Sequence, residues 1–180
     1  MRRVIVILSV VLYTAAVLAG CSGKVQNSRA AGTASERIIE PCELVSKPEA
    51  EQLTGVSLKD AEKTDTRAVG MKLCIYNAAD ESSARFLQIS ITQQAFMPDN
   101  GQTPKSIFQS LKDNFDDAVA VEGIGDEAFI APPGLHLLKE DYYICIAVGN
   151  SDDGNNREIL KAAGRVAVKN LEKLINSTGK

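Results

Sequence analysis

Residue types that commonly do chemistry are few in this chain of 180 residues. It has one histidine, His136, and four cysteines, at positions 21, 42, 74 and 145. Histidine titrates near neutral pH, so it can serve as a general acid or base. No nucleophile motif, however, places a serine or a cysteine beside His136. We therefore expect no catalytic residue; the alternative is a small hydrolase that uses His136 with acids of the turn from Gly123 to Glu127.

That turn combines two glycines with two neighbouring acids. A phosphate-binding loop would need a helix after the glycines, because the unbonded N–H groups at a helix start bind the anion. The residues that follow, Ala128 to Ile130, favour a strand, so we expect a tight turn. Asp126 and Glu127 would point to opposite faces of such a strand. We expect one acid to accept backbone hydrogen bonds instead of forming an acid/base pair.

The segment from Asp152 to Asn156 is rich in the oxygen ligands that calcium prefers. It lacks the alternating spacing and the distal glutamate of an EF-hand loop. A turn followed by a helix cap is the expected structure. The sequence predicts neither a metal site nor a cofactor site.

The N-terminus has the pattern of a secretory signal. Arg2 and Arg3 precede an apolar run from Val4 to Leu18, which is shorter than the roughly 20 residues needed to cross a bilayer. The sequence Leu18-Ala19-Gly20-Cys21 resembles the lipobox of bacterial lipoproteins, in which the cysteine is diacylated on sulfur and becomes the new N-terminus. The resemblance implies a signal peptide of residues 1–20 and a lipid on Cys21. The alternative is an ordinary secretory signal with a chance cysteine.

Cleavage would remove two arginines and no acid, leaving 160 residues with 18 basic and 23 acidic side chains, a formal charge of −5. An acidic chain without a basic cluster argues against nucleic acid as a partner and against electrostatic docking on anionic lipid. We therefore expect membrane attachment through acyl chains on Cys21. The expected location is the cell envelope outside the cytoplasm. Ser22 is not the aspartate that commonly retains lipoproteins at the inner membrane, which favours the outer membrane in a host with two membranes.

Composition divides the remaining chain into a tether and a domain. Residues 21–40 are small and polar without an apolar period, which predicts a lipidated flexible tether. Residues 41–178 have the periodicities of helix, two strands, helix, three strands and helix. Short turns between the strands predict a mainly antiparallel sheet, and the amphipathic helices need a face to bury. The predicted fold class is α+β, a single two-layer domain with helices packed on the sheet.

Four short elements resemble one known family. They are Pro-Cys-x-Leu-Val at 41–45, a capped helix ending in Leu-x-Gly at 53–55, Cys-x-Tyr at 74–76 and Gly-Ile-Gly-Asp-Glu-Ala-Phe at 123–129. Together they resemble the secreted lipoproteins of unknown function grouped as the DUF3558 family, over roughly residues 41–148. The chain departs from that family at Tyr76, where tryptophan is frequent, and in the additional Cys145. The resemblance implies a fold but no activity.

Cys21 aside, three cysteines remain in an oxidising compartment, and three pairings are possible. The family resemblance implies the disulfide between Cys42 and Cys74. Cys145 lies in an apolar run, where we expect a buried thiol that behaves as a small hydrophobe. Pairing of Cys145 with Cys74 and a redox role are the alternatives, although the chain has no Cys-x-x-Cys motif. The whole pattern predicts a non-catalytic binding or accessory module of the cell envelope.

Overall fold

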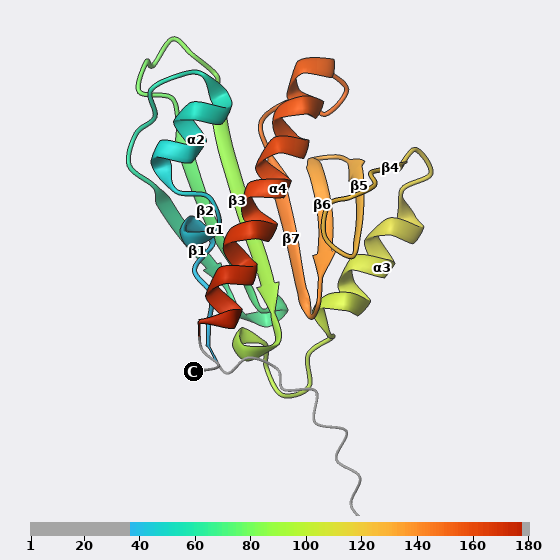
Figure 1. Cartoon of the computed structure of the whole chain (residues 1–180). Coiled ribbons are helices and arrows are strands. Elements are labelled where there is room, and N and C mark those ends of the chain that lie inside the picture. Colours follow the sequence, from blue (N-terminus) through green and yellow to red (C-terminus); the bar gives the residue numbers. More distant parts are fainter. Residues whose placement is uncertain (1–36, 178–180) are drawn as a thin grey trace, which may run out of the picture. The chain divides into compact units, whose positions relative to one another are not determined.

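The computed structural model describes residues 37–177 (Figure 1). The predicted signal peptide, Cys21 and most of the predicted tether lie outside this range. Within it, no helix is long and apolar enough to cross a membrane. The α-helices are α1 (Pro41–Leu44), α2 (Lys47–Thr54), α3 (Pro104–Asn114) and α4 (Gly154–Asn176). The strands are β1 (Glu62–Thr66), β2 (Met71–Asn77), β3 (Phe86–Gln93), β4 (Val119–Ala120), β5 (Glu127–Ala131), β6 (Gly134–Lys139) and β7 (Tyr142–Ala147).

The strands form one antiparallel sheet in the order β1-β2-β3-β7-β6-β5-β4. Each strand pairs with its neighbour in the chain, except at the centre, where β3 pairs with β7. The sheet therefore joins two meanders, β1–β3 and β4–β7. This architecture confirms the predicted class, a single α+β domain with helices packed on a mainly antiparallel sheet.

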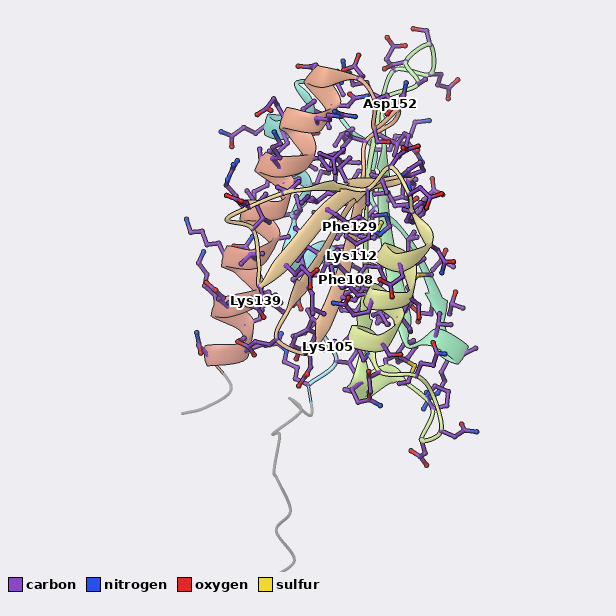
Figure 2. All side chains as sticks on the ribbon, turned by 90° about the vertical axis from the view of Figure 1, so that its right-hand side faces the viewer. Lys105, Phe108, Lys112, Phe129, Lys139 and Asp152 are labelled. Atoms are coloured by element: carbon purple, nitrogen blue, oxygen red, sulfur yellow. A yellow bond between two sulfur atoms is a disulfide. The ribbon has the colours of Figure 1, made fainter. Side chains whose placement is uncertain are left out.

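Helices lie on both faces of this sheet. α4, with α1 and α2, covers one face, and α3 packs on the opposite face against β6 and β7 (Figure 2). Ile144 and Ile146 of β7 belong to the larger core under α4, whereas Tyr143 and Cys145 belong to a smaller core under α3. The prediction of two layers, one of helices and one of strands, therefore holds for the β1–β3 half of the sheet. Over the other half, α3 adds a third layer. Burial on both faces explains why β7 is apolar throughout.

Side chains cap the starts of three helices. The Ser46 backbone N–H donates to the Glu49 carboxylate at 2.8 Å, as part of a capping box that begins α2. Gly55 ends this helix in the left-handed conformation, with φ of 72°. The side chains of Thr103 and Asp153 accept backbone hydrogen bonds at the starts of α3 and α4.

Among the α-helices and strands, three short elements have no counterpart in the sequence prediction: α1, β1 and β4. All five residues of β1, Glu-Lys-Thr-Asp-Thr, are exposed, so no apolar alternation marks the strand. Its backbone pairing with β2 holds it at the sheet edge. Charged side chains on such an edge also discourage pairing with another chain.

The folded domain begins before the predicted boundary at residue 41. Ile39 is fully buried in the larger core. Its backbone N–H donates to Gln93 Oε1 at 2.7 Å, and Gln93 Nε2 donates back to the Ile39 carbonyl at 2.8 Å. Gln93, at the end of β3, thus pairs with the entering chain as a neighbouring strand would. The last residues assigned to the tether are part of the fold.

Candidate functional site

His136, the only histidine of the chain, lies on β6 in the smaller core and is 2% exposed. The ring of Phe129 stacks on it with centroids 4.7 Å apart, and Phe115 lies 5.9 Å away. Burial lowers the pKa of His136 below its ordinary value, although a backbone hydrogen bond with Pro132 opposes the shift. His136 is therefore a neutral imidazole in the folded protein at neutral pH.

The ring nitrogens of His136 have partners inside the protein. Nδ1 lies 2.8 Å from the Tyr143 hydroxyl, and Nε2 lies 3.3 Å from the Pro132 carbonyl oxygen. A carbonyl only accepts, so Nε2 carries the proton and Nδ1 accepts from Tyr143. Cys145 lies in the same core, where burial raises its thiol pKa to about 12. His136 and Tyr143 form a hydrogen-bonded pair inside an apolar core.

The acids that the alternative hydrolase would need are bound elsewhere. Asp126 accepts from the Glu140 backbone N–H at 2.5 Å and pairs with Lys139. Glu127 accepts hydrogen bonds from Gln109 at 2.9 Å and from Lys112, both on α3.

Taken together, these contacts make His136 a structural residue of the core. A general base must reach substrate, and this ring is sealed by Phe115, Phe129 and Tyr143. Nothing in the geometry favours the hydrolase alternative. The sequence predicts that one of the two acids points inward and accepts backbone hydrogen bonds. Asp126 does accept one, from Glu140, but its side chain is exposed.

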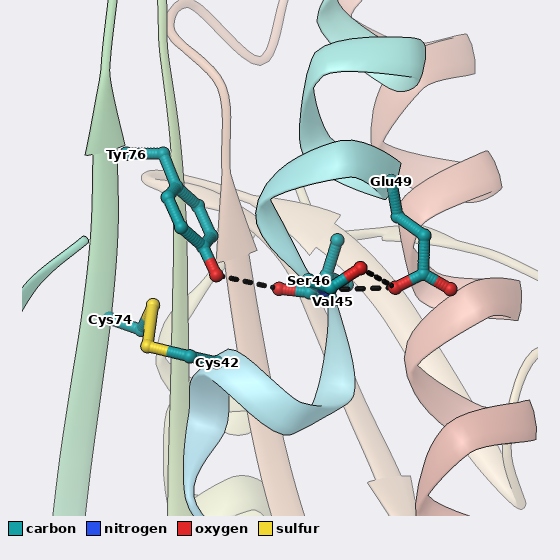
Figure 3. Close-up of a disulfide and its surroundings, with 6 residues drawn as sticks. All are labelled: Cys42, Val45, Ser46, Glu49, Cys74 and Tyr76. Carbon is teal, nitrogen blue, oxygen red and sulfur yellow. Dashed lines mark hydrogen bonds between the residues drawn. A yellow bond between two sulfur atoms is a disulfide. The ribbon is translucent and has the colours of Figure 1, made fainter. Parts of the chain in front are cut away.

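The structure joins Cys42 of α1 to Cys74 of β2, the pair that the family resemblance implies, with Cα atoms 5.5 Å apart (Figure 3). Cys145 is buried and outside any disulfide. Near the bridge, the Tyr76 hydroxyl donates to the Val45 carbonyl at 3.1 Å. The bridge and this bond fix α1, and through it the start of α2, against the sheet.

The fixed position of α2 creates a pocket of about 420 Å³ against α4. Four apolar and three polar residues line it: Leu53, Ile159, Ala162, Val166, Glu49, Gln52 and Glu158. Ile159, Ala162 and Val166 recur along α4 at three- and four-residue steps, so they share one helix face. An apolar hollow with a few polar groups is the usual form of a small-ligand site.

Both ionisable residues of the lining are acids. Glu49 accepts from the Ser46 backbone N–H at 2.8 Å and from Asn170 Nδ2 at 3.1 Å. Burial opposes ionisation of Glu49, but the bonds from Ser46 and Asn170 outweigh it and lower its pKa. Glu158 pairs with Lys161 at 2.9 Å, and its pKa is lowered by that contact. Both carboxylates are ionised at neutral pH.

The other predicted segments have the expected local structures. Gly123 and Gly125 adopt positive φ in a turn that leads into β5, with no helix start to bind a phosphate. Asp153 caps α4, accepting from the Asn156 backbone N–H at 2.9 Å. Across residues 37–177, no cluster of three or more histidine, cysteine or acidic side chains could hold a metal ion.

The pocket between α2 and α4 was not foreseen from the sequence. Its residues come from segments about a hundred positions apart, and the sequence marks them as ordinary helix faces. Comparisons with protein-family models, with curated proteins and with solved structures found no match to this chain. Membership of the DUF3558 family therefore stays a prediction.

Proposed function

We propose that this chain is a lipoprotein of the cell envelope, anchored outside the cytoplasm through Cys21, whose domain is a non-catalytic binding or accessory module. The observation that carries the proposal is Leu18-Ala19-Gly20-Cys21 directly after an apolar run that is too short to cross a membrane. The disulfide in the domain supports it, because such bonds persist in oxidising compartments.

Two features of the domain support binding over catalysis. His136 is sealed in the core with its ring nitrogens bonded, whereas the pocket between α2 and α4 is open and largely apolar. No observation favours a second function.

Metabolic labelling with a fatty-acid analogue tests the anchor. We expect the wild-type chain to incorporate the label, to be cleaved after Gly20 and to fractionate with membranes. Cys21→Ala should lose both label and cleavage, because the acylated cysteine is the processed residue. Cys145→Ala is the matched control and should be labelled like wild type. Equal labelling of Cys21→Ala and wild type would contradict the proposal.

A further inference from the structure

Exposed apolar side chains lie where the predicted tether enters the domain. The exposed large hydrophobic residues of the described chain, residues 37–177, are Ile38, Val69 and Val119. Ile38 is 41% exposed and lies in the entering segment. Val69 is 42% exposed and ends the 3₁₀ helix η1 (Arg67–Val69). Val119 lies on β4, at the opposite edge of the sheet from β1.

Hydrogen bonds hold Ile38 and Val69 at one end of the sheet. The Gln93 side chain, at the end of β3, bonds to the Ile39 backbone. The Gln93 backbone N–H donates to the Gly70 carbonyl at 3.1 Å. Ile39 and Gly70 are the chain neighbours of the two exposed residues, so Gln93 holds both segments together. They lie at the end of the sheet where the arrow of β3 stops (Figure 1).

A half-buried aromatic ring extends this apolar surface. Phe96 belongs to the 3₁₀ helix η2 (Gln94–Phe96), which begins directly after β3. The Arg67 guanidinium lies 5.5 Å from the centroid of this ring, and the Lys72 ammonium lies 4.9 Å from it. Apolar side chains flanked by lysine and arginine are typical of segments that lie in the surface of a bilayer. We call Ile38, Val69 and Phe96 the tether-end patch.

No excess of basic side chains surrounds the tether-end patch. Lys72 pairs with Glu40 at 3.0 Å and with Asp65 at 3.1 Å. The Arg37 guanidinium lies 3.4 Å from the Glu43 carboxylate. The turn between β6 and β7, at the same end of the sheet, adds exposed acids. Contact with lipid would therefore depend on the removal of apolar area from water, not on attraction to anionic headgroups.

We propose that the tether-end patch docks the domain on a zwitterionic lipid surface, a role that rests on the proposed anchor at Cys21. The predicted tether between the anchor and the described chain, from Ser22 to Glu36, has 15 residues. A flexible chain of that length has an r.m.s. end-to-end distance of roughly 20 Å. An acylated Cys21 therefore keeps this end of the domain at a high effective concentration beside the bilayer. Ile38 and Val69 then lie at the boundary between headgroups and acyl chains, where burial of their apolar area favours the contact.

The test uses the full mature lipoprotein in phosphatidylcholine nanodiscs that contain a small fraction of lipid with a gadolinium chelate on its headgroup. Paramagnetic broadening of a methyl signal reports how close that methyl group comes to the lipid surface. Met97 is the reporter at the patch, because its side chain is buried against Gly70. Val119 is the reporter away from the patch. We expect strong broadening at Met97 and weak broadening at Val119.

Variants separate docking from the effect of the tether alone. Ile38→Ser with Val69→Ser removes apolar area and leaves the tether length unchanged. The ratio of docked to free domain, measured by the broadening at Met97, should fall roughly tenfold. Val69→Ser alone leaves the entering segment intact and should lower this ratio roughly threefold. Val119→Ser is the matched control and should leave the broadening at Met97 unchanged.

Equal broadening at Met97 in wild type and in the two patch variants would overturn the proposal, because the tether alone would then explain it. Methyl shifts of Ile38 and Val69 that appear only with two chains in one nanodisc would assign the patch to a second copy of the chain, and would overturn it as well. Docking that requires added phosphatidylglycerol and is abolished by salt would show electrostatic attachment instead of apolar contact.

The mass of the N-terminal peptide from the same sample reports the lipid on Cys21 independently. Failed docking with a lipidated Cys21 would reject the patch and leave the anchor in place. An unlipidated Cys21 would reject the anchor, and with it the docking role. The two failures are therefore distinguishable.

Discussion

At the scale of single residues, the chain uses its chemically capable side chains for structure. His136 and Tyr143 satisfy each other in the smaller core instead of facing solvent, and Cys145 is buried in the same core. Buried polar groups of this kind cost free energy when a partner is removed, because the remaining group loses its hydrogen bond in an apolar setting. The consequences are measurable at His136 and at Cys145.

Acid should destabilise the fold through His136. Its pKa is lower in the folded protein than in the unfolded chain, so the unfolded chain binds more protons below about pH 6.5. The free energy of unfolding should therefore fall as pH decreases from 7 to 5, by at most about 1.4 kcal/mol per pH unit. Urea unfolding at several pH values measures this slope. His136→Gln should flatten it, since the chain has no other histidine; an unchanged slope would show that folding does not lower the pKa of His136.

Cys145→Ala should remain folded and cost about 1 kcal/mol, as expected for the small cavity left by one sulfur atom. Tyr143 keeps His136 as its hydrogen-bond partner in this variant. Thiol labelling of the native protein checks the buried state: Cys145 should react only after unfolding. Rapid labelling of native Cys145 would contradict the burial described here.

At the scale of elements, the sequence predicts the helices and strands that have local signals. It misses those that depend on contacts with distant segments. α2 was predictable because Ser46, Glu49 and Gly55 supply its start and end within ten residues. β3 was predictable from the alternation of Leu87, Ile89 and Ile91. β1 has no apolar pattern, and its strand state depends on pairing with β2.

Neither the position of α3 nor the pocket could be predicted from the sequence, for the same reason. Phe108 marks an apolar face of α3 but does not say which face of the sheet it covers. The pocket needs α2 and α4 side by side, and their packing depends on contacts distant in sequence.

The disulfide between Cys42 and Cys74 should contribute substantially to stability at this scale. It closes a loop with a sequence separation of 32, for which chain entropy predicts about 3–4 kcal/mol. Cys42→Ala should lose about that much, more than Cys145→Ala. It should also leave Cys74 as a free thiol that reacts with thiol reagents once the chain unfolds, because Cys74 is fully buried. Equal losses of unfolding free energy in Cys42→Ala and Cys145→Ala would contradict a stabilising role for the disulfide. Peptide mapping without reduction should show one crosslink, and a crosslinked peptide containing Cys145 would overturn the pairing.

At the scale of the whole molecule, the chain combines a predicted lipid anchor and tether with one compact domain. The two hydrogen bonds between the Ile39 backbone and the Gln93 side chain, here called the clamp, define where the domain begins. The predicted tether therefore joins the domain beside the end of β3.

Truncation should locate this boundary. Deletion of residues 24–36 should leave the thermal unfolding midpoint unchanged, because the sequence there has no apolar period to bury. A deletion that continues through residue 40 should lower the midpoint by several degrees, since it removes the buried Ile39 and leaves the Gln93 amide without its backbone partners. Equal midpoints for the two deletions would contradict the clamp.

The most direct test of the central claim is the mass of the N-terminal peptide from the membrane-bound protein. We predict that the mature chain begins at Cys21 and that this peptide carries a diacylglycerol modification on sulfur. In Cys21→Ala, the N-terminal peptide should carry no lipid and should retain residues of the predicted signal peptide. A wild-type N-terminus other than Cys21, or a Cys21 peptide without lipid, would contradict the claim.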